Sequence, residues 1–93
     1  MPYIPKDDRI PFEAYLQDIE GVVKEFGFSN GDLNYLITRI CKIYQDKHGT
    51  SYNIIKDVVG ALECAKLEYY ARIARPYEDK KIKTNGDVYD NSI

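Results

Sequence analysis

The last third of the chain gathers basic and aromatic side chains whose chemistry suits an anionic ligand. Arginine can grip a phosphate through two parallel hydrogen bonds, and tyrosine rings can stack on nucleobases. A small nucleotide-type ligand would be bound here by two arginines, two lysines and two tyrosines: Arg72, Arg75, Tyr77, Lys80, Lys81 and Tyr89. The simpler interpretation is a solvated turn at residues 80–83 and two arginines that stabilise a helix C-terminus. Nearby acidic residues weaken the local positive field, which argues against long nucleic acid as a partner.

A second set of side chains has the composition of a protein–protein interface. Tyr35 and Arg39 are four residues apart, so they share one face of a helix. Tyrosine and arginine are enriched where proteins meet. Tyr69 and Tyr70 are two further aromatic candidates for such an interface. The alternative for Tyr35 and Arg39 is an ordinary stacked pair on a solvated surface.

Residue types that serve catalysis or bind metals are scarce. His48 is the only histidine and lies near an expected helix end, so no Ser/His/Asp or Cys/His set can be assembled. Cys41 and Cys64 are most simply small apolar residues. Residues 85–87, Asn-Gly-Asp, are interpreted as a turn because the carboxylate ladder of a calcium loop is missing. We therefore expect no enzymatic activity, no metal and no cofactor.

Length and composition indicate one globular domain. The chain has 93 residues and a net charge of −2, with nine tyrosines and no tryptophan. No apolar run approaches the roughly 18–20 residues of a membrane span. The first residues lack the basic and apolar regions of a secretory signal. With two cysteines and no export signal, we expect the reduced cytoplasm as the compartment.

The spacing of apolar residues predicts an all-α fold. Residues 1–10 are expected to form an extended arm, because Pro2 and Pro5 oppose helix formation. Residues 11–76 form the predicted three-helix domain, with helices over about 11–26, 33–47 and 52–75, the last ended by Pro76. Residues 77–93 form a short ordered tail, in which a hairpin around Asn85-Gly86 is predicted.

The third predicted helix indicates self-association. At about 1.5 Å per residue it is about 36 Å long, so its end projects beyond the other two helices. Such an end must be covered by the tail or by another subunit. Small residues on this helix would let a neighbouring helix approach closely: Gly60, Ala61, Cys64 and Ala65. We therefore expect a homo-oligomer.

Four segments carry a resemblance to a known family: residues 1–5, 33–39, 60–70 and, most specifically, PYEDKKIK at 76–83 followed by NGDVY at 85–89. With these residues the chain resembles a small uncharacterised family found in bacteriophages and bacteria. The resemblance covers nearly the whole chain. It implies an origin but no mechanism, because the family has no assigned activity. Its signature of polar residues near the C-terminus favours that segment as the site.

Two functions from different classes remain open. The first is a non-catalytic helical protein that acts through self-assembly and protein–protein contact. The alternative is a protein that sequesters a small anionic nucleotide-type ligand through its C-terminal tyrosines, arginines and lysines. Neither function involves a membrane or long nucleic acid.

Overall fold

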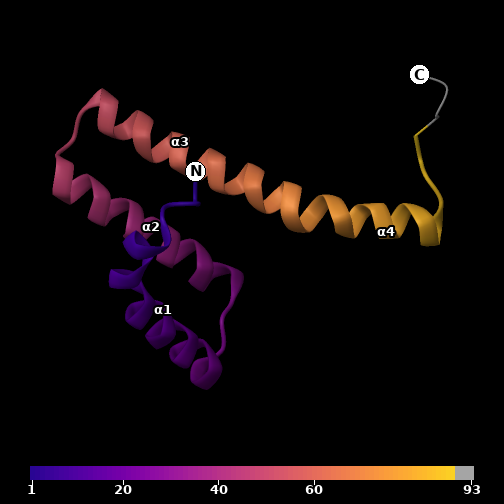
Figure 1. Cartoon of the computed structure of the whole chain (residues 1–93), viewed down its shortest axis with the longest axis horizontal. Helices are drawn as coiled ribbons and strands as arrows, with labels where there is room; N and C mark the ends of the chain where they lie inside the picture. Colours follow the sequence, from indigo (N-terminus) through magenta and orange to yellow (C-terminus); the bar gives the residue numbers. More distant parts are fainter. Residues whose placement is uncertain (90–93) are drawn as a thin grey trace.

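The computed structural model describes residues 1–89 of the chain (Figure 1). Helix α1 spans Lys6–Phe26, α2 spans Asn30–His48 and α3 spans Tyr52–Tyr69; a π-helical turn, η1, covers Tyr70–Ala74 and continues into α4, Arg75–Asn85. Helix makes up 83% of these residues, which contain no strand. The predicted all-α, three-helix fold is confirmed, with α3, η1 and α4 joined into one continuous rod.

Helix α1 begins five residues earlier than predicted. Pro5 precedes it, and its carbonyl accepts a 2.9 Å hydrogen bond from the Asp8 amide. Asp7 and Asp8 in the first turn interact favourably with the positive end of the helix dipole. Pro11 lies inside the helix, where its missing N–H removes only one helical hydrogen bond. The extended arm is therefore residues 1–5, and the expectation that Pro11 opens the helix is wrong.

Local side-chain and glycine chemistry fixes the boundary between α1 and α2. Gly27 has a φ of 84°, a conformation that glycine adopts without strain, and it ends α1. Ser29 and Asp32 then form a reciprocal capping box at the start of α2. The Asp32 amide donates to Ser29 Oγ at 3.0 Å, and the Ser29 amide donates to Asp32 Oδ2 at 2.9 Å. Asp32 thus stands inside the first turn of α2.

Pro76 does not end the third helix, contrary to the sequence-based expectation. Proline lacks the N–H that would bond four residues back, and its ring crowds the carbonyl there. The π-helical turn η1 directly precedes it, with the Arg75 amide bonded to the Tyr70 carbonyl five residues back. Helix resumes as α4 and ends at Gly86, whose φ is 90°. Residues 81–83 are therefore helical, and the hairpin predicted around Asn85-Gly86 is wrong.

The helices are loosely arranged. The backbones of α2 and α3 approach each other, whereas no such approach joins α1 to another helix. The Cα radius of gyration is 17.8 Å, against about 12 Å for a compact chain of this length. No side chain of the described residues is buried, so these helices do not enclose a core within one chain.

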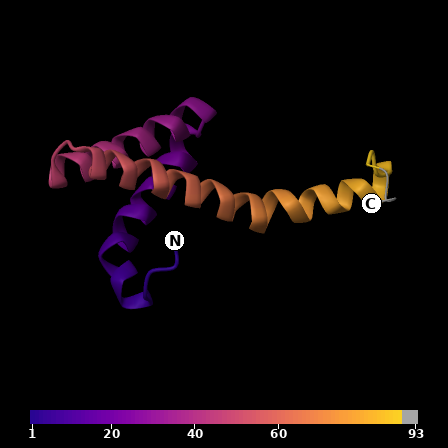
Figure 2. The same cartoon turned by 90° about the horizontal axis from the view of Figure 1, so that it is seen from above.

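The end of the long rod projects away from the rest of the molecule, as the helix length predicted. Both Figure 1 and Figure 2 show α4 extending beyond α1 and α2. Within the described chain, α4 packs only against η1, the turn from which it grows. The surface of α4 is therefore not covered by α1, α2 or α3 in the described chain.

Candidate functional site

The two arginines of the predicted ligand site are both paired with carboxylates on their own helix. Arg72 Nε donates to Glu68 Oε1 at 3.1 Å, and Arg75 Nη2 donates to Asp79 Oδ1 at 2.6 Å. These partners raise the pKa of both guanidinium groups. Both arginines are thus partly neutralised before any ligand arrives.

The other four residues of that predicted site are spread along the end of the rod. Lys81 Nζ lies 5.5 Å from the centre of the Tyr77 ring, so these two share a face of α4. Lys80 lies one residue earlier on the same helix. Tyr89 lies beyond α4, and its amide donates to Asp87 Oδ1 at 2.8 Å. Because α4 packs against no other helix of the described chain, nothing folds over these side chains to make a cleft.

Tyr35 and Arg39 lie on one face of α2, as their spacing predicts. Arg39 Nη1 donates to the Tyr35 hydroxyl at 2.7 Å, and the guanidinium carbon lies 5.7 Å from the ring centre. Tyr69 and Tyr70, the other interface candidates, are exposed where α3 meets η1. The Tyr35–Arg39 pair lies on α2, whereas Tyr69 and Tyr70 lie where α3 meets η1. The four residues therefore belong to different elements of the fold.

A contact that sequence reasoning missed joins the N-terminal arm to the rod. The Tyr3 hydroxyl donates to Glu68 Oε1, and the Arg72 guanidinium lies 5.9 Å from the Tyr3 ring centre. Hydrogen bonds from Tyr3 and Arg72 hold the pKa of the Glu68 carboxyl below its usual value. The same bond to Glu68 raises the pKa of the Tyr3 hydroxyl. Since 65 residues separate Tyr3 from Glu68, no local pattern could have signalled this contact.

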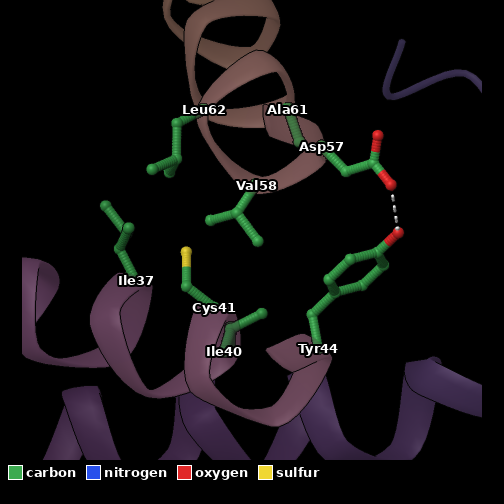
Figure 3. Close-up of a pocket in the computed structure, with 8 residues that line it drawn as sticks. All are labelled: Ile37, Ile40, Cys41, Tyr44, Asp57, Val58, Ala61 and Leu62. Atoms are coloured by element: carbon green, nitrogen blue, oxygen red, sulfur yellow. Dashed lines mark hydrogen bonds between the residues drawn. The ribbon is translucent and has the colours of Figure 1, made fainter. Parts of the chain in front are cut away.

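A largely apolar groove runs between α2 and α3 (Figure 3). Its volume is about 370 Å³, and we call it the α2–α3 groove; it is lined by Ile37, Ile40, Cys41, Tyr44, Asp57, Val58, Ala61 and Leu62. Tyr44 donates a 3.2 Å hydrogen bond to Asp57 Oδ2 across one end. Loss of water around the hydroxyl, and then the charge of Asp57, raise the pKa of Tyr44.

A second groove lies between α1 and α2. It measures about 410 Å³, and we call it the α1–α2 groove; it is lined by Asp18, Ile19, Val22, Val23, Phe26, Gly27, Phe28, Asp32, Tyr35 and Leu36. Its lining joins an apolar floor to two carboxylates, Asp18 and Asp32. Tyr35, predicted from sequence as an interface residue, forms part of this lining. Both grooves therefore combine a largely apolar lining with one or two carboxylates.

Two kinds of function find no support in the described chain. Residues 1–89 contain no group of three or more histidine, cysteine, aspartate and glutamate side chains placed to hold a metal ion. Over the same residues, no helix combines the length and apolar character needed to cross a membrane.

Comparison with known proteins assigns the chain to a family. Residues 1–88 match a family described as "Domain of unknown function (DUF6899)". No curated protein and no solved structure gave a match. Because the match covers almost the whole chain, the protein belongs to this family of domains of unknown function, DUF6899.

Proposed function

We propose that this protein is non-catalytic and acts by self-assembly, its helices completing a shared core only when copies associate. The observation that carries the proposal is the absence of any buried side chain among the described residues. Burial of apolar surface is the main force that offsets the entropy of folding. Helices whose apolar faces stay open therefore need a partner to supply that burial.

The amount of exposed surface supports the same proposal. The chain exposes 8646 Å², whereas a compact monomer of this mass exposes about 5,500 Å². The excess, about 3,100 Å² per chain, is well above the roughly 800 Å² per partner of an ordinary stable interface. An area of this size is typical of obligate, intertwined oligomers rather than transient contacts.

The identity of the exposed residues also supports self-assembly. Large apolar side chains stand open on every helix, among them Phe12 and Phe26 on α1, Ile40 on α2 and Val59 on α3. Large exposed apolar patches mark association sites in soluble proteins. At Gly60 on α3, a Cβ atom would meet no other heavy atom within 4 Å, so this position is open for a neighbouring helix to approach.

Sedimentation velocity over nanomolar to tens of micromolar protein tests this proposal. We expect a dimer or larger species that dissociates on dilution with loss of helical circular dichroism. A folded monomer at every concentration, with a cooperative unfolding transition independent of concentration, contradicts the proposal.

The alternative function is binding of a small anionic nucleotide-type ligand at the end of the rod. It is favoured by Lys80, Lys81 and Lys83, which have no carboxylate within ion-pair distance among residues 1–89. A thermal-shift screen with nucleotides and cyclic nucleotides tests it. Stabilisation that disappears in Lys81→Ala and Arg75→Ala supports binding there, and the absence of any shift contradicts it.

We further propose a bacteriophage or bacterial origin and a cytoplasmic location. The family resemblance supports the origin. Both cysteines are free thiols, Cys41 half-buried and Cys64 exposed, which suits a reducing compartment.

A further inference from the structure

The α1–α2 groove is apolar inside and acidic at its edge. On α1, Tyr15, Val22 and Phe26 recur at spacings of seven and four residues, so they share one exposed face. Asp18 lines the groove, and Glu25, seven residues later, lies on the same side of α1 but outside that lining. A segment that fits this surface should offer an apolar or aromatic ridge beside positive charge.

The described chain holds a segment of that kind at the end of its rod. Ile73, Tyr77, Lys80 and Lys81 recur at helical spacing, and the stacking of Lys81 on Tyr77 places these two on one face. Ile73 and Tyr77 are each more than half exposed. The ridge thus carries two apolar anchors followed by two lysines.

The unsatisfied charges of the two segments are complementary. Helix α1 has six carboxylates against three basic side chains, and α4 has four basic side chains against two carboxylates. The ion pairs found within residues 1–89 lie on α2 or along the α3–η1–α4 rod, and none involves a carboxylate of α1 or a lysine of α4. Complementary charge sets the register and the choice of partner, while apolar contact supplies affinity.

One chain cannot make this contact with itself in the described arrangement. Helix α4 continues a rod that bends near η1 and leads away from α1 and α2 (Figure 2). A second copy has the same ridge and the same groove, so two copies related by a two-fold axis can each insert a ridge into the other's groove. The area that two such contacts would bury can come from the roughly 3,100 Å² that each chain exposes beyond a compact monomer.

We infer that the occupant of the α1–α2 groove is α4 of a second copy, with Tyr77 in the groove and Lys80 and Lys81 against Asp18 and Glu25. This inference rests on the proposed self-assembly and names its surface. It also assigns the C-terminal basic residues to contact between subunits instead of to a small ligand.

Carboxyl–amine cross-linking tests the contact on the unmodified protein. Wild-type chains are mixed with a heavy-nitrogen-labelled copy, refolded together, cross-linked and analysed by mass spectrometry. We expect mixed-isotope peptides that join Asp18 or Glu25 to Lys80 or Lys81. A dimer whose mixed-isotope links join only other segments overturns this inference and leaves self-assembly intact, whereas a monomer without such links overturns both.

Charge reversal adds a quantitative test. Lys80→Glu combined with Lys81→Glu should raise the dimer dissociation constant about 5- to 30-fold. Adding Asp18→Lys and Glu25→Lys should return it to within a few-fold of wild type. The matched control, Lys47→Glu with Lys56→Glu, changes net charge equally and should leave the constant nearly unchanged. The inference is overturned if the control weakens dimerisation as much as the double variant does. It is also overturned if the variant with all four substitutions does not regain the wild-type dissociation constant.

Discussion

Replacing Ile40 by alanine distinguishes an isolated chain from an assembled one. Ile40 lines the α2–α3 groove, yet its side chain is 60% exposed within one chain. Full burial of an isoleucine stabilises a fold by about 1.5–3 kcal/mol, so losing a side chain that is mostly exposed should destabilise an isolated chain by no more than about 1 kcal/mol. If association covers the groove, the same truncation leaves a cavity and costs about 2–5 kcal/mol.

Urea unfolding followed by circular dichroism at several protein concentrations measures this difference. We expect Ile40→Ala to lower the free energy of unfolding by 2 kcal/mol or more, on the scale of core truncations, with a midpoint that rises with protein concentration. Val88→Ala is the matched control, because Val88 is 91% exposed and lies beyond α4. A loss of about 1 kcal/mol or less for Ile40→Ala, independent of concentration, would refute the reasoning.

Three further predictions concern the arm and the rod. Tyr3→Phe removes the hydrogen bond to Glu68 and should speed amide exchange in the first turn of α1, measured by hydrogen–deuterium exchange; unchanged exchange would mean that this bond does not hold the arm. The pKa of the Glu68 carboxyl is lower in the folded chain than in the unfolded chain. Its contribution to stability is therefore complete above the unfolded pKa and is lost as the pH falls through the folded pKa. An NMR titration in which the Tyr3 resonances do not change together with those of Glu68 contradicts this coupling. Pro76→Ala restores a backbone N–H to the helix and should stabilise the rod by up to about 3 kcal/mol. Amide exchange and carbon chemical shifts should then show α-helix in place of the π-helical turn. A π-helical turn that persists in the variant would show that Pro76 is not its cause.

The sequence predicted the features that depend on local chemistry. Apolar spacing located three helices. In the structure, Gly27 and Gly49 with positive φ follow the ends of α1 and α2. The Tyr35–Arg39 pair followed from a four-residue spacing on one helix. Each of these features arises within a few residues, where sequence spacing and spatial distance correspond.

Features that depend on competing or distant interactions could not be predicted in the same way. Pro76 is a strong helix terminator by itself, yet a π turn before it lets the rod continue, and that compensation leaves no separate sequence signal. Tyr3 meets Glu68 only because the arm folds back across the rod. The predicted ligand residues are close in sequence, but the η1–α4 rod presents five of them in succession along its length and Tyr89 lies beyond its end.

The proposed self-assembly would give the tyrosine content a physical explanation, because the core would then form between chains. All nine tyrosines are exposed in the single chain, from Tyr44 at 38% to Tyr89 at 81%. A tyrosine ring supplies large apolar area, while its hydroxyl keeps a hydrogen bond to water or protein in either state. Such a side chain tolerates exposure before association better than phenylalanine or tryptophan, and it loses little rotational freedom when covered. A chain that must remain dispersed until it meets its copy can therefore place tyrosine where a monomeric domain would place leucine or tryptophan.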